Sequence, residues 1–311
     1  LDEPLANLDT AGAEMLMSTL KSLAKAGYCI IVIEHRLDVV LPFVDKVFHV
    51  GNRNVNEITD RENYLKEQST EIEDTCSTFS GTLPAFSLAD VAFAVKERDI
   101  LNGVTFDILK GSRTVLLGEN GCGKTTLLRL ISRLEKPTRG VILQNIDDKF
   151  GQKSKQSKKW YKKVGVVYQN PDYQLFMQTV EKEIKFGAKS DEYADEIAEK
   201  FGIKHLYARH PQSLSEGQKR RVSIAAVVAT DPEVLILDEP TVGQDYKGLC
   251  EMVEVLNKLH EEAHNTMITV THDKRCAAAL CDKSVWIKNG KTYKTGGKEL
   301  VDEFFIQIGV N

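Results

Sequence analysis

A glycine-rich segment that ends in a lysine and a threonine gives the strongest chemical signal in the sequence. Residues 118–125 read GENGCGKT, a full match to the pattern G-x-x-x-x-G-K-[ST], and lie between an apolar run and a helix-like run. The glycines let successive N–H groups point at phosphate oxygens, and the following helix adds its positive N-terminal end. Lys124 would place its charge on the β- and γ-phosphates, and Thr125 would offer a hydroxyl to Mg²⁺. The candidate residues of this nucleoside triphosphate site are Gly118, Glu119, Asn120, Gly121, Cys122, Gly123, Lys124, Thr125 and Thr126.

Two adjacent carboxylates end a later apolar run. Residues 234–239 read VLILDE, and the four consecutive apolar residues indicate a strand that is covered on both faces. Open α/β sheets bind their ligands at the carboxyl ends of the strands, so we expect Asp238 and Glu239 to face the phosphate segment. Asp238 would hold Mg²⁺ through water, and Glu239 would orient or deprotonate the attacking water.

A repeat defines the elements that position these residues. LDEPLANLD at 1–9 recurs as LDEPTVGQD at 237–245, and each copy continues with an amphipathic run and then an apolar run that ends in His35 or His272. The repeat predicts two copies of a domain of about 230 residues. Because the second LDEP ends a buried strand, we expect Leu1 to begin inside a core strand and the chain to be a fragment.

The repeat divides the chain into three parts. Residues 1–65 would be the C-terminal half of the first domain, 66–86 a polar, Ser/Thr-rich linker, and 87–311 a complete second domain. In the second domain short β-like runs are followed by a helix-rich middle and a return to strand–helix–strand, which predicts an α/β fold.

Composition excludes several classes of protein. The chain has 311 residues, 42% of them hydrophobic and 28% charged, as in a globular protein, and its net charge of −4 gives no reason to expect nucleic-acid binding. No apolar run approaches the roughly 18 residues of a membrane span. The six cysteines form no C-x-x-C pair, which indicates reduced thiols.

Further motifs make the sequence resemble a known family. LSEGQ at 214–218 lies between the phosphate segment and the carboxylates, and Gln169, VGQD and His272 complete the motif set of the ATP-binding cassette (ABC) ATPases in order. The segment YQNPDYQLFMQTVEKEIKFG at 168–187 resembles the energy-coupling-factor (cobalt and vitamin importer) branch. The resemblance implies a P-loop NTPase core with an antiparallel β part and an inserted α-helical subdomain.

The resemblance also implies roles for particular residues. Gln169 would link the Mg²⁺ and water site to the helical part, and His272 would hold the γ-phosphate and the attacking water. The signature residues Ser215, Gly217 and Gln218 would contact nucleotide on the opposite cassette. In the first copy, Asp2, Glu3 and His35 match the carboxylates and the histidine, and Asp9 and Asp245 would communicate across a dimer.

The implied cofactors are ATP and Mg²⁺, and the implied partners are an integral membrane coupling or permease subunit and a second ABC cassette, in cis in the full-length chain or by dimerisation. The protein would lie peripherally on the cytoplasmic face of the cell membrane. The alternatives are a soluble tandem ABC ATPase that acts on ribosomes or DNA, and a tandem sugar importer. The first predicts a long charged arm between the cassettes, and the second a degenerate second signature; this sequence has neither.

The sequence departs from the family pattern at two positions. Glu216 replaces the first glycine of the signature, and Val95 occupies the place where an aromatic residue often stacks on adenine, so we expect weak discrimination between nucleobases. Cys122, beside Lys124 and at a helix N-terminus, is expected to have a lowered pKa.

Three other segments carry expectations of their own. An exposed cluster of Tyr173, Leu175, Phe176 and Met177 would receive a short helix of the membrane subunit. The Lys-rich stretch 147–163 is interpreted as a solvated loop. HEEAH at 260–264 matches a zinc-binding pattern, but no third ligand follows at a suitable distance, so a metal site is not expected there.

Overall fold

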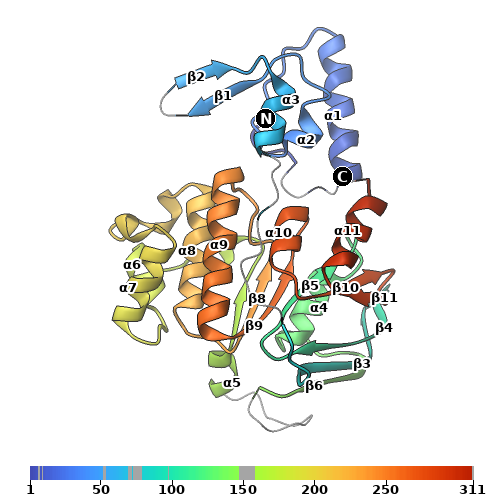
Figure 1. Cartoon of the computed structure of the whole chain (residues 1–311), viewed down its shortest axis with the longest axis vertical. Helices are drawn as coiled ribbons and strands as arrows, with labels where there is room; N and C mark the ends of the chain where they lie inside the picture. The colour runs from blue at the N-terminus through green and yellow to red at the C-terminus, as the bar shows by residue number, and fades with distance from the viewer. Residues whose placement is uncertain are drawn as a thin grey trace.

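A six-stranded sheet forms the centre of residues 84–309, which we call the second domain (Figure 1). The computed structural model describes residues 1–5, 8, 10–51, 54–68, 72, 79–96, 98–146 and 158–309. The strand order is β11-β10-β5-β9-β8-β7, in which neighbours from β10 to β7 run parallel and β11 is antiparallel to β10. The strands are β5 (Arg113–Leu117), β7 (Val164–Val167), β8 (Val234–Asp238), β9 (Thr266–Val270), β10 (Lys283–Lys288) and β11 (Lys291–Gly296).

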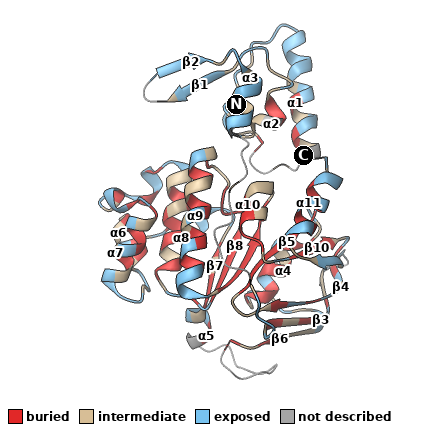
Figure 2. Cartoon of the chain, viewed as in Figure 1, coloured by how far each residue is buried: buried red, intermediate tan, exposed pale blue. Residues whose placement is uncertain are grey.

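The middle of this sheet is buried on both faces. Every residue of β5, β8 and β9 is buried, which is the pattern expected for parallel strands with helices or a second sheet on each side (Figure 2). The predicted strand that ends in Asp238 is therefore confirmed.

A second sheet packs against one side of the first. Its three antiparallel strands have the order β4-β3-β6, with β3 at Pro84–Val95, β4 at Arg98–Leu109 and β6 at Arg139–Gln144. One hydrophobic cluster joins its side chains to those of the central strands and of helix α4 (Lys124–Ile131). These strands confirm the antiparallel β part.

Helices form the other side of the second domain, where Figure 1 places α6 to α9. A separate hydrophobic cluster joins residues of α6 to α10. The helices of this domain after α4 are α5 (Lys158–Lys163), α6 (Val180–Lys185), α7 (Asp191–Lys200), α8 (Glu216–Val228), α9 (Tyr246–Ala263), α10 (Lys274–Ala279) and α11 (Lys298–Gln307). Single 3₁₀ turns occur at η1 (Pro171–Tyr173), η2 (Lys204–Leu206) and η3 (Pro211–Ser213).

The Lys-rich stretch is only partly a loop. Residues 147–157 lie outside the described residues, but Lys158–Lys163 form α5. Trp160 of this helix is buried and donates a hydrogen bond from its indole nitrogen to Gln144. The expectation of a solvated loop is wrong for this part, because one aromatic side chain anchors it to the core.

The first part of the chain forms its own small core. Leu5, Ala13, Met17, Val39 and Val40 are buried together. Its elements are α1 (Thr10–Lys25), α2 (Leu37–Val40), α3 (Arg61–Gln68) and an antiparallel pair of β1 (Phe48–Gly51) and β2 (Asn54–Glu57).

The two strands expected in this first part, at its start and before His35, are reduced to a short parallel pairing. Residues 1–4 and 29–35 meet in a parallel bridge between Asp2 and Ile33, and the backbone of Ile33 exchanges hydrogen bonds with Leu1 and Glu3. The side chain of Ile33 is exposed. In the second domain the strand equivalent to residues 29–35 is β9, which has a neighbouring strand on each side. Residues 29–35 are paired on one side only in the described part of the chain.

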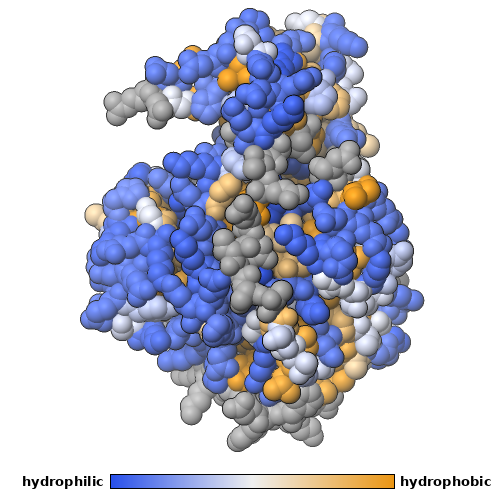
Figure 3. Space-filling view, in the orientation of Figure 1, coloured by the Kyte–Doolittle hydropathy of each residue, from blue (hydrophilic) through white to orange (hydrophobic). Residues whose placement is uncertain are grey.

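No helix in the described ranges is long and apolar enough to cross a membrane. The face of the molecule seen in Figure 3 is mainly hydrophilic over α6 to α9.

Candidate nucleotide site

The phosphate segment leaves β5 and turns sharply into α4. Gly118 and Gly123 have positive φ angles of 152° and 105°, a region that side chains with a Cβ rarely adopt. A Cβ on Gly118 would lie 2.5 Å from the carbonyl oxygen of Ile287, and one on Gly123 would lie 2.5 Å from Cδ2 of Leu101. Both positions therefore require glycine, and the loop is held tightly between β10 and β4.

The ammonium group of Lys124 is hydrogen-bonded to carbonyl groups of the same loop. Lys124 is buried, and its Nζ donates to the carbonyl oxygens of Gly118 at 2.7 Å and Glu119 at 3.0 Å. Asn120 and Gly121 are exposed at the rim. The segment thus has a buried cation beneath an open rim, an arrangement that suits an anion approaching from solvent.

Asp238 joins the acidic run to this loop. It ends β8, which is two strands from β5, and accepts a hydrogen bond from the side chain of Thr125. Burial raises the pKa of Asp238, while the Thr125 hydrogen bond and the charge of Lys124 act in the opposite direction. The predicted meeting of the two motifs at one edge of the sheet is what the structure describes.

Glu239 is buried beside His272. The carboxylate Oε2 of Glu239 accepts a hydrogen bond from the backbone N–H of His272 at 3.2 Å, and Oε1 lies 3.4 Å from Nε2 of the same residue. Within the described residues, Oε1 has no hydrogen-bond partner. Burial and, next, the charge of Asp238 raise the pKa of Glu239 to about 8, so this carboxylate binds a proton more strongly than an ordinary one.

Gln169 follows β7 at the same edge of the sheet. Val167, the last residue of β7, pairs with Leu237, so Gln169 extends past the level of Asp238 and is exposed. Its carbonyl oxygen and that of Tyr168 accept hydrogen bonds from Arg220 of α8, the latter at 2.7 Å. The sequence analysis did not single out Arg220.

The signature segment forms the start of α8. The hydroxyl of Ser215 accepts from the backbone N–H of Gln218 at 3.3 Å, and the side-chain oxygen of Gln218 accepts from the N–H of Ser215 at 3.2 Å. This reciprocal pair is a capping box, so the side chain of Gln218 is bonded to its own helix start. Glu216 is the first helical residue and does not interrupt the helix.

Gly217 packs against the loop that precedes α9. A Cβ on it would lie 2.9 Å from the carbonyl oxygen of Gly243, and its own carbonyl accepts from Nε2 of Gln244 at 2.9 Å. Asp245 caps α9 by accepting from the N–H of Gly248 at 2.7 Å. Asp9, its counterpart in the repeat, lies outside the described residues.

The carboxylate and histidine occur a second time in the first part of the chain. The N–H of Glu3 donates to the carbonyl of Ile33 at 2.9 Å, as that of Glu239 does to Val270 at 2.9 Å. Both glutamates have positive φ, 42° and 53°, and Nε2 of His35 lies 3.5 Å from Oε1 of Glu3. The sequence repeat is therefore also a repeat of local structure.

The pKa of Cys122 is shifted in the direction opposite to the one expected. Burial is the largest influence and raises the pKa of its thiol, and the nearby charge of Lys124 only opposes this effect. The expectation of a lowered pKa is wrong, because the sequence shows which charges are near but not how far the sulfur is desolvated.

The aromatic cluster after Gln169 is split between surface and core. Tyr173 and Phe176 are 81% and 67% exposed, but Leu175 is buried among the helices. Phe186, which sequence reasoning missed, is 58% exposed and packs edge-to-face on Phe176 at 5.4 Å between ring centroids. We name Tyr173, Phe176 and Phe186 the aromatic patch.

A buried carboxylate holds the backbone below the aromatic patch. Glu183 of α6 accepts hydrogen bonds from the N–H groups of Phe176 at 2.9 Å and Met177 at 2.6 Å. Burial raises its pKa, against these two bonds. Sequence reasoning missed Glu183 because its neighbours are charged and it resembles a solvated helix residue.

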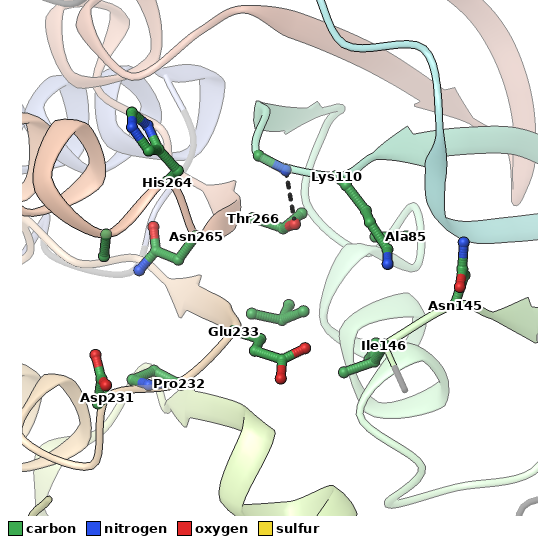
Figure 4. Close-up of a pocket in the computed structure, with 13 residues that line it drawn as sticks. Ala85, Lys110, Asn145, Ile146, Asp231, Pro232, Glu233, His264, Asn265 and Thr266 are labelled. Atoms are coloured by element: carbon green, nitrogen blue, oxygen red, sulfur yellow. Dashed lines mark hydrogen bonds between the residues drawn. The ribbon is translucent and has the colours of Figure 1, made fainter. Parts of the chain in front are cut away.

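A separate cavity of about 280 Å³ lies at the opposite edge of the sheet (Figure 4). It is lined by Gly111, Val234 and Thr266, which lie at or just before the amino ends of β5, β8 and β9. His264 also lines it, but no group of three or more His, Cys, Asp or Glu side chains gathers as metal ligands in the described ranges. The cavity is therefore distinct from the nucleotide site.

Known proteins share both the fold and the motifs. Residues 101–242 match the family model described as ABC transporter. The putative HMP/thiamine import ATP-binding protein YkoD of Bacillus subtilis is 31% identical over 324 residues, which cover 91% of this chain and 58% of that protein. The energy-coupling factor transporter ATP-binding protein EcfA2 of Enterococcus faecalis is 40% identical over 221 residues, 66% of this chain and 74% of that protein.

Solved structures agree with this assignment. The structure of cbiO1 from Clostridium perfringens, part of the ABC transporter complex cbiONQ, has a TM-score of 0.62 and 31% identity, and the match covers 71% of this chain and 92% of that one. The cassette MJ0796, in a dimeric state bound to ADP and Pi, has a TM-score of 0.61 and 26% identity over 68% of this chain and 98% of that one.

Fold and motifs together define an ABC transporter ATPase domain in the second part of the chain. The chain belongs to the energy-coupling factor branch of the ABC transporter ATP-binding proteins. It spans 58% of the length of YkoD and about three quarters of the EcfA2 proteins, 74% and 76% in two of them.

Proposed function

We propose that the chain is the ATP-hydrolysing subunit that powers a membrane importer of the energy-coupling-factor type. The observation that supports it most directly is the convergence of the phosphate segment, Asp238 and Glu239 at one edge of the sheet. A family relation to import proteins favours transport over action on ribosomes or DNA.

The residues at this edge of the sheet bind the phosphates and supply ligands for Mg²⁺. Backbone N–H groups of 118–126 and Lys124 bind the phosphates of ATP. The Thr125 hydroxyl, Asp238 and Gln169 supply hard oxygen ligands of the kind that Mg²⁺ takes, and Mg²⁺ when bound would neutralise phosphate charge.

Water activation falls to Glu239. Its Oε1 is buried without a hydrogen-bond partner in the described part of the chain, and its raised pKa makes the deprotonated carboxylate a stronger base than an ordinary glutamate. His272 holds the other oxygen through its backbone and presents its imidazole toward the same carboxylate.

A second cassette completes the site. Ser215 is exposed at the positive end of a helix of 13 residues, where it can meet the phosphates of nucleotide on another cassette, with Gly217 and the backbone of Gln218. We assign residues 1–65 to the C-terminal half of a first ABC domain, 66–86 to a linker, and 87–311 to a second ABC domain. The repeated Glu3–His35 pair supports this division.

The partner is an integral membrane coupling subunit, and the chain lies peripherally on the cytoplasmic face of the membrane. A short amphipathic helix of that subunit would cover the aromatic patch, whose three rings are exposed and two of which, Phe176 and Phe186, form an edge-to-face pair. Gln169, four residues before Tyr173, connects the patch to the hydrolysis site.

Two variants test this proposal. Glu239→Gln should keep ATP binding and lower the rate of hydrolysis by about 10² or more, since water activation is lost and the phosphate site is kept. Glu254→Gln, an exposed acid on α9, should hydrolyse ATP as the wild type does. Hydrolysis by Glu239→Gln at the wild-type rate would contradict the assignment of Glu239. Because the site needs a second cassette, the specific ATPase activity of the wild type should also rise with protein concentration.

A variant in the aromatic patch tests whether this surface binds the membrane subunit. Phe176→Asp should abolish co-purification with the membrane subunit while ATP binding is unchanged. Ile306→Asp, an equally exposed apolar residue on α11, is the matched control and should still bind the partner. Retained binding by Phe176→Asp, or loss of ATP binding with it, would show that the aromatic patch is not the docking surface.

A further inference from the structure

Arg220 is a buried cation in an unusual setting. Its side chain lies on α8, is 2% exposed, and donates to the carbonyl oxygens of Tyr168 and Gln169. Its Nε has no hydrogen-bond partner, and no carboxylate lies within ion-pairing distance of it, in the part of the chain that the structure describes. The charges of Glu239, Asp238 and Glu216 attract the guanidinium only through space, and burial outweighs them and lowers its pKa to about 10. Burying a guanidinium without a direct ion pair is costly.

The neighbouring residues of α8 behave differently. Lys219 forms ion pairs with Asp172 and Glu216, both at 3.0 Å, and Arg221 pairs with Glu251 of α9 at 2.8 Å. Each of these two cations is neutralised by a carboxylate. Of these three residues, Arg220 is the one whose side-chain N–H groups donate to backbone carbonyl oxygens. Those oxygens belong to Tyr168 and Gln169.

The position of Arg220 connects two motifs that are far apart in the sequence. Helix α8 packs on β7 and on η1, on either side of Gln169. Arg220 lies five residues after the helix cap Ser215, so it moves with the signature. The hydrogen bonds to Tyr168 and Gln169 are therefore a direct mechanical link from the signature to Gln169.

We propose that Arg220 is a positioning residue for ATP hydrolysis, which from the signature helix fixes the backbone of Gln169 and so sets where the Gln169 side chain lies. The inference rests on the proposed function. A displacement of α8, when its cap meets nucleotide on the other cassette, is transmitted to the backbone of Gln169 through the side chain of Arg220. Arg220 forms no ion pair with Asp238 or Glu239 in the described part of the chain, and its charge acts on the pKa of Glu239 only through space. The double-mutant cycle with Gln169 isolates the positioning role from this charge effect.

A double-mutant cycle distinguishes this role from a general structural one. In the full chain, Arg220→Met should lower kcat for ATP by about tenfold with little change in the ATP dissociation constant. Gln169→Ala should lower kcat as well, and Arg220→Met should cause no further loss when Gln169 is already alanine, because the side chain that it positions is absent. Arg221→Met, whose partner is on α9, is the control, and its effect should multiply with that of Gln169→Ala.

Each outcome decides the inference. Effects of Arg220→Met and Gln169→Ala that multiply in the double variant would overturn it, as would an unchanged kcat in Arg220→Met. If Arg220→Met does not fold, Arg220→Lys, which keeps the charge but reaches one carbonyl at most, takes its place in the same cycle. A wild-type chain that binds ATP but never hydrolyses it would instead refute the proposed function on which the inference rests.

Discussion

The imidazole of His272 lies 3.4 Å from the carboxylate of Glu239, and the same pair recurs at His35 and Glu3 at 3.5 Å. In both places the glutamate has a positive φ and its N–H bonds to the adjacent strand, so local backbone geometry sets the pair. The environments differ, because the Glu239 side chain is 6% exposed and that of Glu3 is 29% exposed. The pKa of Glu239 is raised by this burial, which depends on the surrounding sheet and not on the motif.

Lys124→Ala should weaken ATP binding by about one to two orders of magnitude, which corresponds to the loss of charge-assisted hydrogen bonds to phosphate. Lys124 is buried beneath the loop, so no other lysine can replace it. Isothermal titration calorimetry with Mg·ATP measures the effect. Lys136→Ala, an exposed lysine after α4, should bind as the wild type does, and equal affinity in both variants would remove Lys124 from the site.

Val95→Tyr should tighten ATP binding by about fivefold, because an aromatic stack on the base contributes about 1 kcal/mol. Val95 is 48% exposed at the end of β3, so a larger ring has room there. Competition between ATP and GTP gives the measurement. Val95→Leu adds volume but no π-face and should change little. If Val95→Tyr leaves the affinity unchanged, this strand end does not meet the base.

The thiol of Cys122 should react slowly at pH 7 and faster as the pH rises, since burial raises its pKa and the thiolate is the reactive form. Cys29 is exposed and provides a comparison within the same molecule. Alkylation with iodoacetamide, followed by peptide mass spectrometry, should modify Cys29 first, and ATP should protect Cys122 further. Faster labelling of Cys122 than of Cys29 at pH 7 would contradict the burial argument.

Glu183 should make the stability of the helical part depend on pH. Burial raises its pKa in the folded state, so the unfolded chain loses its proton at lower pH than the folded chain does. The free energy of unfolding should therefore fall as the pH rises from the ordinary pKa of a glutamate to the raised value, and then level off. Glu183→Gln, which can still accept from Phe176 and Met177, should reduce this slope in urea unfolding between pH 5 and pH 8. An identical slope in both proteins would assign the pH dependence to other groups.

Site residues could be predicted from the sequence where their types and spacing together match a known motif. The phosphate segment, Asp238 and Glu239 were identified from residue types and spacing, and His272 from the repeat and the family resemblance. The α/β fold followed from the order of apolar runs and from the same resemblance. These features depend on local backbone geometry, which a motif specifies directly.

The features that were missed depend on burial. Arg220 lies in a charged run, KRR, that resembles a solvent-exposed helix face, and only the packing of α8 on β7 shows that its side chain is enclosed. Glu183 was missed and the pKa of Cys122 was mispredicted for the same reason, because the sequence does not show that these side chains are buried. The partial failure of the predicted strand at 29–35 has a related cause, because a strand needs neighbours and the sequence does not show which neighbours it has.

The strand that carries the phosphate loop lies deep in the sheet. β5 has parallel neighbours on both sides, β10 and β9, and all five of its residues are buried. Its amide protons should therefore be among the last to exchange with deuterium, with opening free energies close to that of global unfolding. The exposed rim at 119–121 should exchange within the dead time. Nucleotide can thus bind and leave at an exposed rim while the strand that anchors the loop stays closed over many turnovers.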